Sequence, residues 1–447
     1  MKDKIPYRIR ELMQKLIDEG YEAYVIGGCV RDFLLGRKPH DYDIFTNATG
    51  DQILELFPEG KVLGNEERQK KILTVIVDGV EISQYRKNGD RTETGTSLKE
   101  HQKTCDFTFN SIAMDIEGNI IDINKGQEDL KKRLVRFVGK PEDRIKEDPL
   151  RILRGFRFVS KYGFLFEKDT GFKLHDHRKL LLDLPKERIR EEMLKIFNGP
   201  DYHNIFECIF EDFFPELYHE NHFKYGGDHH DETPFEHMKN SFEEAFKLTS
   251  NPLLRLACRL HDVAKGLTTT KDEDGKQIHF YGHENIGEKL MKEKLVKLKF
   301  STEEIDYITT LIRLHMYSYN ATPGKKSYIR FFDKLEKAKI PIEDYIILIY
   351  CDRQGNLAKP RIKFGEFLKG NWLLKKYYEI KYSEEPMNVT DLKVGGKDVM
   401  EILKIEPGPD IGKILNALFE EVMEGNIKNE RGELMNELKK IVVGDKK

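Results

Sequence analysis

Residues 25–44 read VIGGCVRDFLLGRKPHDYDI and bring two chemically different signals close together. Gly27 and Gly28 follow a short β-type run and precede a helical pattern, and glycines at such a junction let backbone N–H groups approach a phosphate. Asp41 and Asp43 are two apart in a segment with strand character, so we expect both carboxylates on one face. Adjacent carboxylates repel each other unless a divalent cation lies between them. The stretch therefore predicts a site where Mg²⁺ ions neutralise a triphosphate and activate an attacking hydroxyl.

The sequence around this stretch alternates between helical and strand patterns. Residues 8–19 carry apolar side chains at helical spacing. Short strands are predicted at residues 22–26, 41–45, 73–77 and 80–84. Asp78-Gly79, between the last two, predicts a tight hairpin. From about residue 130 helical patterns dominate. The fold class that follows is a multidomain α/β plus α protein, in which a mixed-sheet head precedes a long helical body.

Composition limits the class of protein. The chain has 447 residues, of which 39% are hydrophobic and 34% charged, with a net charge of −3, and this length suits several domains. No run approaches the ~20 apolar residues that cross a bilayer, and the first residues lack an apolar signal core, so we expect a cytoplasmic protein without a membrane partner. Five scattered cysteines, none spaced as CxxC, argue against a disulfide framework and a cysteine zinc site.

The motif order resembles that of class II CCA-adding enzymes and bacterial poly(A) polymerases, which are polymerase β-like nucleotidyltransferases. Residues 105–114, CDFTFNSIAM, resemble the ribose-binding segment of this family. Residues 147–158, EDPLRILRGFRF, resemble its nucleobase-reading helix, and residues 187–196, ERIREEMLKI, resemble the helix that braces it. The resemblance covers roughly residues 20–200.

The resemblance implies a role for each matching residue. These roles are Mg²⁺ binding by Asp41 and Asp43, triphosphate binding by Gly27, Gly28 and Arg31, ribose binding by Asp106 and Asn110, base selection by Asp148 and Arg151, and triphosphate or RNA contacts by Arg154 and Arg157. Asp148 and Arg151, three apart on a helix, would offer a base edge an acceptor beside a donor. For Arg154 and Arg157 a solvated basic helix face is an equally good interpretation.

The chain departs from the family pattern just before Asp106. Thr104-Cys105 stand where most relatives have two arginines, so a triphosphate contact is either missing or supplied by Arg86, Lys103 or another basic residue. The segment between Arg86 and Asp106 is short and lacks the Arg-x-Pro element of the loop that helps relatives switch from C to A addition. In addition, Glu81 is either a third active-site carboxylate or an exposed strand residue.

A second group of polar residues lies between residues 229 and 352 in helical, apolar-periodic surroundings. Imidazole together with carboxylate suits Mn²⁺, Fe²⁺, Co²⁺, Ni²⁺ or Zn²⁺. The pattern resembles the HD phosphohydrolase superfamily. By that resemblance the metal ligands are His237, His261, Asp262 and Asp352, and the residues for a second metal or a substrate phosphate are His283 and His315.

Four domains are expected from these patterns: a nucleotidyltransferase head (1–138), a helical neck with the base-selecting helix (139–226), an HD domain (227–357) and a helical RNA-binding tail (358–447). The expected reaction is attack by the 3′-hydroxyl of tRNA, or of another RNA 3′ end, on the α-phosphorus of CTP or ATP. For the HD domain the resemblance implies hydrolysis of 2′,3′-cyclic phosphates or 2′-phosphates as a possible second activity.

Three alternatives remain open. The chain could add only CC or only A, or could be a poly(A) polymerase. The HD phosphohydrolase could be the main activity, with a degenerate RNA-binding head, and Thr104-Cys105 favours this reading. An RNA-binding scaffold without activity is disfavoured because both sets of metal ligands are complete.

Overall fold

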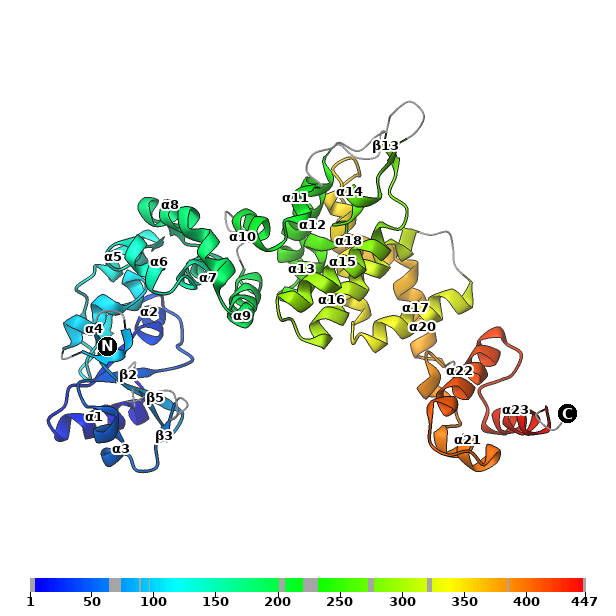
Figure 1. Ribbon diagram of the computed structural model, residues 1–447, viewed down its shortest axis with the longest axis horizontal. Helices are drawn as coiled ribbons and strands as arrows, with labels where there is room; N and C mark the ends of the chain where they lie inside the picture. Colours follow the sequence, from blue (N-terminus) through cyan, green and yellow to red (C-terminus); the bar gives the residue numbers. More distant parts are fainter. Residues whose placement is uncertain are drawn as a thin grey trace. The chain divides into compact units, whose positions relative to one another are not determined.

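The computed structural model describes residues 5–63, 74–87, 90–95, 97–200, 206–219, 232–271, 277–319, 324–383 and 386–444 (Figure 1). The chain divides into two compact units, Met1–Asp212 and Phe213–Lys447. Each unit contains its own set of buried apolar side chains.

A mixed seven-stranded sheet forms the centre of the head. Its strands are β1 (Tyr24–Ile26), β2 (Asp43–Thr46), β3 (Lys61–Val62), β4 (Thr74–Val77), β5 (Val80–Gln84), β8 (Ala113–Met114) and β9 (Ile120–Ile121). The strand order is β3-β4-β5-β2-β1-β8-β9. β2 and β5 run parallel, whereas the other neighbouring strands run antiparallel. The predicted mixed α/β head with an antiparallel component is therefore confirmed.

The hairpin predicted at Asp78-Gly79 joins β4 to β5, with both turn residues at positive φ (50° and 77°), as a tight turn between strands requires. The prediction of a strand over residues 41–45 is wrong at its start, because β2 begins at Asp43. Asp43 pairs with Glu81, only one residue into β5, so Asp41 lies beyond the end of its partner strand. The argument that placed Asp41 and Asp43 on one strand face therefore does not apply.

Helices complete the first unit. They are α1 (Tyr7–Asp18), α2 (Gly28–Leu34), α3 (Gly50–Leu56), α4 (Leu98–Thr104), η2 (Thr108–Asn110), α5 (Gly126–Lys132), α6 (Pro141–Glu147), α7 (Arg151–Tyr162), α8 (Lys168–His177), η3 (Arg178–Asp183), α9 (Lys186–Phe197) and α10 (Phe206–Phe213). Two small sheets pair β6 (Arg86–Lys87) with β7 (Asp90–Thr94) and β10 (Leu134–Val135) with β11 (Leu165–Phe166). The helix predicted at residues 8–19 corresponds to α1, which buries Ile9, Leu12, Met13 and Leu16.

The segment expected to be one base-reading helix is two helices. α6 ends at Glu147, and Asp148 follows in an extended conformation (φ −150°, ψ 97°) before α7 begins at Arg151. Pro149 accounts for the break, since a residue before proline is disfavoured in the helical region. Asp148 and Arg151 therefore belong to a turn and a helix start, and the prediction that they share one helix face is wrong.

Aromatic packing fixes α7 against the segment after Asp106. The rings of Phe107 and Phe109 both lie edge-on to Phe158 of α7, at centroid distances of 5.4 and 5.0 Å. Phe107 also stacks on Phe137 at 4.8 Å. On its other side α7 packs against α9, where Ser160 Oγ donates to the Ile196 carbonyl at 2.7 Å. This packing holds the polar side chains of both segments in fixed relative positions.

The second unit is helical apart from a small hairpin of β12 (Thr270–Lys271) and β13 (Gln277–His279). Its helices are α11 (Glu216–His219), α12 (Pro234–Leu248), α13 (Pro252–Leu260), α14 (Lys265–Thr268), α15 (His283–Lys297), α16 (Thr302–Leu314), η4 (His315–Tyr319), α17 (Lys325–Lys337), α18 (Ile342–Gly355), α19 (Phe364–Gly370), α20 (Trp372–Lys381), η5 (Val389–Asp391), α21 (Gly396–Leu403), α22 (Pro409–Glu424) and α23 (Arg431–Gly444). α12 packs against α13 and α18, and α16 against α13 and α15 (Figure 1). None of the helices in the described ranges is long and apolar enough to cross a membrane.

Candidate active site and metal centre

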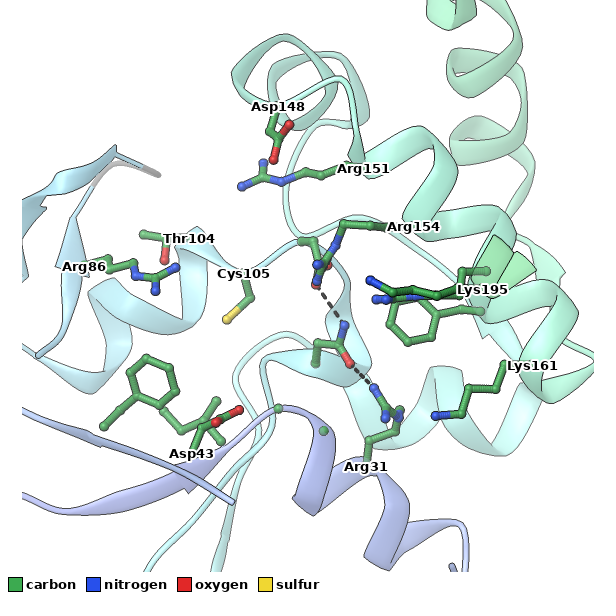
Figure 2. Close-up of a pocket in the computed structure, with 18 of the residues that line it drawn as sticks. Arg31, Asp43, Arg86, Thr104, Cys105, Asp148, Arg151, Arg154, Lys161 and Lys195 are labelled. Atoms are coloured by element: carbon green, nitrogen blue, oxygen red, sulfur yellow. Dashed lines mark hydrogen bonds and ion pairs between the residues drawn. The ribbon is translucent and has the colours of Figure 1, made fainter. Parts of the chain in front are cut away.

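A cavity of about 700 Å³ in the first unit gathers most of the residues predicted for nucleotide binding (Figure 2). The predicted residues that line it are Gly27, Gly28, Arg31, Asp43, Asp106, Asn110, Asp148, Arg151, Arg154 and Arg157. Asp41 is exposed and is not among the lining residues. Gly27 is left-handed (φ 86°) where the chain turns from β1 into α2, a conformation that glycine adopts without steric cost.

The carboxylates at one side of the cavity suit a divalent cation. Burial, together with the charges of Glu81 and Asp41, raises the pKa of Asp43 to about 6. A cation among these groups would remove the repulsion that raises this pKa. The carboxylates of Asp43, Glu81 and Asp41 offer hard oxygen ligands of the kind that Mg²⁺ prefers. Asp43 therefore fits a Mg²⁺ site to which Glu81 and Asp41 lie close enough to contribute charge.

A continuous chain of hydrogen bonds crosses the cavity. Arg154 donates to Asp106 Oδ2 from Nε (2.9 Å) and Nη2 (2.5 Å), and Asn110 Nδ2 donates to Asp106 Oδ1 at 2.9 Å. Asn110 Oδ1 in turn accepts from Arg31 Nη1 at 2.7 Å. Burial opposes ionisation of Asp106, but Arg154 and these hydrogen bonds still lower its pKa. Asp106 and Asn110 are thus held in place by two arginines, one from α7 and one from α2.

The residues expected to read the base are held by neighbours rather than by each other. Asp148 pairs with Arg188 of α9, whose Nη2 lies 3.2 Å from Oδ2. Arg151 Nη1 donates to the Arg144 carbonyl at 3.0 Å and to Glu147 at 2.6 Å. Figure 2 shows both side chains projecting from the same end of the cavity. The break in the helix therefore still leaves an acceptor beside a donor.

The unusual Thr104-Cys105 pair lies in the cavity wall beside Arg86 (Figure 2). Burial raises the pKa of the Cys105 thiol to about 12, so this position carries no charge at neutral pH. Among the basic candidates for the missing charge, Arg86 lines the cavity, and its charge offsets part of the rise in the pKa of Asp43. Lys103 is not among the lining residues.

The cavity also contains residues that the sequence analysis did not assign, notably His101, Lys161 and Lys195. Lys161 continues the series Arg154, Arg157 at helical spacing, so extending that series by one turn would have found it. His101 is buried, and desolvation lowers its pKa to about 3. No sequence signal separates it from an ordinary core histidine.

All six residues predicted for the HD centre come together in the second unit. They come from α12, α15, α18 and the ends of α13 and α16. His237 Nε2 lies 3.2 Å from His261 Nε2 and 3.0 Å from Asp352 Oδ1. His283 Nε2 lies 3.1 Å from His315 Nε2. These contacts define two donor groups: His237 with His261 and Asp352, and Asp262 with His283 and His315.

The ring orientations direct Nε2 of each histidine toward the other donor atoms of the centre, where a metal ion would bind. Nδ1 lies 3.0 Å from the Cys258 carbonyl in His261, 2.7 Å from the Phe280 carbonyl in His283 and 2.7 Å from the Ile312 carbonyl in His315. A carbonyl only accepts, so Nδ1 carries the proton and Nε2 keeps its lone pair. In His237 it is the carboxylate of Glu232 that lies beside Nδ1, at the longer distance of 3.4 Å. Glu232 was not predicted.

Asp262, a member of the second donor group, also contacts the first. Its Oδ2 is 3.2 Å from His261 Nε2, and its Oδ1 is 3.1 Å from His283 Nε2 and 3.3 Å from His315 Nε2. Burial opposes its ionisation, yet Lys265, 2.6 Å away, and His261 hold the pKa of Asp262 well below its usual value. An ionised carboxylate with one oxygen facing each group suits a bridging ligand of two divalent cations.

Four family models match successive parts of the chain. Residues 23–136 match the poly A polymerase head domain, 163–218 a probable RNA and SrmB-binding site of polymerase A, 234–352 the HD domain, and 375–438 the tRNA nucleotidyltransferase domain 2. The first match contains the cavity residues up to Asn110 and the second those from Lys195 onward, whereas the lining residues from Asp148 to Lys161 lie between the two matches. The third match contains the histidine–aspartate centre.

Relatives and solved structures match nearly the whole length. The CCA-adding enzyme of Ligilactobacillus salivarius is 30% identical over 444 residues, which is 96% of this chain and 95% of the relative. The CCA-adding enzyme of Lactococcus lactis subsp. lactis is 27% identical over 454 residues, covering 98% and 99%. The crystal structure of the Bacillus stearothermophilus CCA-adding enzyme in complex with CTP has a similar fold (TM-score 0.63, 24% identity, 98% of this chain and 97% of that one).

Proposed function

The chain belongs to the family of CCA-adding enzymes, and we propose from this premise that it adds C and A to the 3′ end of tRNA, using CTP and ATP and no nucleic-acid template. One observation carries the proposal at the level of residues. A single cavity gathers the carboxylate for a metal ion (Asp43), the ribose-binding pair (Asp106 and Asn110) and the base-selecting pair (Asp148 and Arg151). These five are the residues to which the family resemblance assigns those roles.

The reaction forms a bond between the RNA 3′-oxygen and the α-phosphorus and breaks the bond between the α-phosphorus and the pyrophosphate that leaves. Mg²⁺ bound at Asp43, with Asp41 or Glu81 as a further ligand, supplies charge neutralisation and an activated hydroxyl. Asp106 and Asn110 orient the sugar, since their own positions are fixed by Arg154 and Arg31. Arg86 supplies positive charge beside the neutral Cys105.

Each part of the chain has a proposed task. Residues 1–138 catalyse the transfer, 139–226 select the base, 227–357 form the HD domain, and 358–447 bind RNA. Support for the last assignment comes from Gly395 and Gly408, which immediately precede α21 and α22, where backbone N–H groups suit RNA phosphates. A tRNA-processing role is consistent with a cytoplasmic location.

The test uses the full chain with Mg²⁺, labelled CTP or ATP, and tRNAs that end at the discriminator base, at C or at CC. We expect CTP to extend the first two and ATP to extend the third. Extension that stops at CC would show a CC-adding enzyme, and extension of CC ends alone would show an A-adding enzyme. Runs of A on any RNA would show a poly(A) polymerase. If no substrate is extended, the proposed function fails.

A second activity is proposed for the HD centre, because both of its donor groups are complete and its histidine tautomers suit a transition-metal ion. We propose that it hydrolyses 2′,3′-cyclic or 2′-phosphates at RNA ends. Such a reaction would clean a damaged 3′ end before nucleotide addition.

Asp148→Ala is expected to weaken base selection. Loss of a charged hydrogen-bond partner costs about 1.5–3 kcal/mol, which is roughly a ten- to hundredfold loss of discrimination. The measurement compares kcat/KM for CTP and UTP on a tRNA that ends at the discriminator base. The control is Arg188→Gln, which removes one ion-pair partner of Asp148 but leaves its carboxylate, and should keep more of the discrimination than Asp148→Ala. Equal discrimination in wild type and Asp148→Ala would contradict base reading by Asp148.

A further inference from the structure

One end of the nucleotide cavity carries an excess of positive charge. Arg31, Arg157, Lys161 and Lys195 line this part of the wall. Arg31 Nη2 lies 3.0 Å from Asp32. Arg157 and Lys195 both contact Glu192 Oε1, at 3.2 and 3.1 Å. In the part of the chain that the structure describes, two carboxylates therefore pair with three of these cations, and the fourth has no ion pair.

That cation is Lys161. Within the described residues its ammonium has no hydrogen bond and no ion pair, and its contact is with the face of the Tyr162 ring, 5.3 Å from the centroid. The same ring faces the guanidinium groups of Arg31 and Arg37, at 5.1 and 4.7 Å. Burial, followed by the charge of Arg31, lowers the pKa of Lys161, and the opposing charge of Asp32 offsets only part of this. A cation held among like charges is stabilised by a bound anion.

The order of residues along the cavity indicates which anion this is. Asp148 and Arg151 lie at one end, and Arg31 and Lys161 lie at the opposite side (Figure 2). Between them runs the hydrogen-bond chain from Arg154 through Asp106 and Asn110 to Arg31. A nucleotide with its base at the first end and its ribose at the centre has its phosphates directed toward the second. The excess of positive charge and the order of residues along the cavity thus both indicate that the phosphates lie near Lys161.

We propose that Lys161 is a further substrate-binding residue, which binds the β- and γ-phosphates of the incoming CTP or ATP and hence the pyrophosphate that leaves. This inference rests on the proposed nucleotidyl transfer. It also bears on the departure at Thr104-Cys105, because Lys161, in the last turn of α7, adds positive charge to the same cavity beside that of Arg86. Lys161 would bind these phosphates by electrostatic attraction and hydrogen bonding, and it forms no covalent bond.

The test measures binding to the full-length protein by calorimetry, without RNA, for CTP, CMP and inorganic pyrophosphate. In Lys161→Gln the Kd for CTP and for pyrophosphate is expected to rise about tenfold or more, the effect of one charged hydrogen bond, while the Kd for CMP stays unchanged. Lys161→Arg should restore most of the affinity. Lys131→Gln, a change of an exposed lysine in α5 of the same unit, is the matched control and should bind like wild type.

Two results would overturn the inference. One is an equal loss of CTP and CMP affinity, which would indicate damage to the cavity as a whole. The other is unchanged CTP binding with weaker and less salt-dependent tRNA binding, which would place Lys161 on the RNA backbone. The proposed function is tested separately. If Lys161→Gln has the expected lower affinity for CTP but the wild-type protein extends no tRNA, Lys161 still binds phosphate and only the transfer reaction is refuted.

Discussion

Asp43→Asn is expected to lower kcat/KM for nucleotide addition by roughly a thousandfold, because several kcal/mol of metal-derived stabilisation depends on this carboxylate. Asparagine keeps the size of the side chain but removes the charge that holds the cation. Asp43 is the member of the pair that lies in β2, lines the cavity and has a raised pKa. The measurement is single-nucleotide extension of tRNA at saturating Mg²⁺, with an unfolding curve for each variant.

Two further variants make this result specific. Asp51→Asn changes an exposed carboxylate of α3 in the same unit and should leave addition intact. Asp41→Asn separates two arrangements of the metal site: a loss as deep as that of Asp43→Asn means that the cation recruits Asp41 from its exposed position. Near-normal activity means that Glu81, opposite Asp43 in the sheet, is the second ligand. If Asp43→Asn keeps more than about a tenth of wild-type activity, which is within ~1.4 kcal/mol, the assignment of Asp43 is wrong.

The second large effect is expected at the HD centre. Asp262→Asn should remove bound divalent metal from the chain, because Asp262 faces both donor groups, and should abolish any hydrolysis of 2′,3′-cyclic nucleotides. Metal that binds only the folded state stabilises it by about 2.7 kcal/mol at a hundred times its Kd. A chelator should therefore lower the unfolding temperature of wild type and leave that of Asp262→Asn unchanged. Metal content is measured by elemental analysis.

The two sites lie in different units of the chain, so a change at one site serves as a control for the other. Asp262→Asn should retain nucleotide addition, and Asp306→Asn, at an exposed carboxylate of α16, should retain both metal content and stability. Metal content equal to wild type in Asp262→Asn would refute the bridging assignment. Loss of tRNA extension in the same variant would refute the independence of the two centres.

Local signals predicted the parts of the fold that depend on a few neighbouring residues. The Asp78-Gly79 turn and helix α1 appear where the sequence places them. The start of β2 does not lie where the sequence predicts it, because it depends on the register with β5. No short stretch of sequence specifies that register. The break at Asp148 lies between these cases: Pro149 was visible, but the family resemblance favoured a continuous helix.

The candidate sites divide in a similar way. The six residues predicted as HD metal or phosphate ligands were found from their motif spacing, and the structure brings all of them together. The partners that hold these side chains were not found. Asp106 accepts from Arg154, 48 residues away, and Glu232, although near His237 in the sequence, faces it only once the start of α12 has formed. The chemical type of each side chain could therefore be predicted from the sequence. The hydrogen-bond or ion-pair partner that holds the side chain in position could not.

The ion pair between Asp106 and Arg154 also bears on how the chain folds. Asp106 is buried in the head, and its charge is compensated by a guanidinium from α7. Leaving one partner of a buried pair uncompensated typically costs about 3–5 kcal/mol, a large part of the stability of a small domain. A fragment that ends at residue 138 would bear this cost. Head and neck, although they perform different tasks, are therefore expected to unfold together as one cooperative unit.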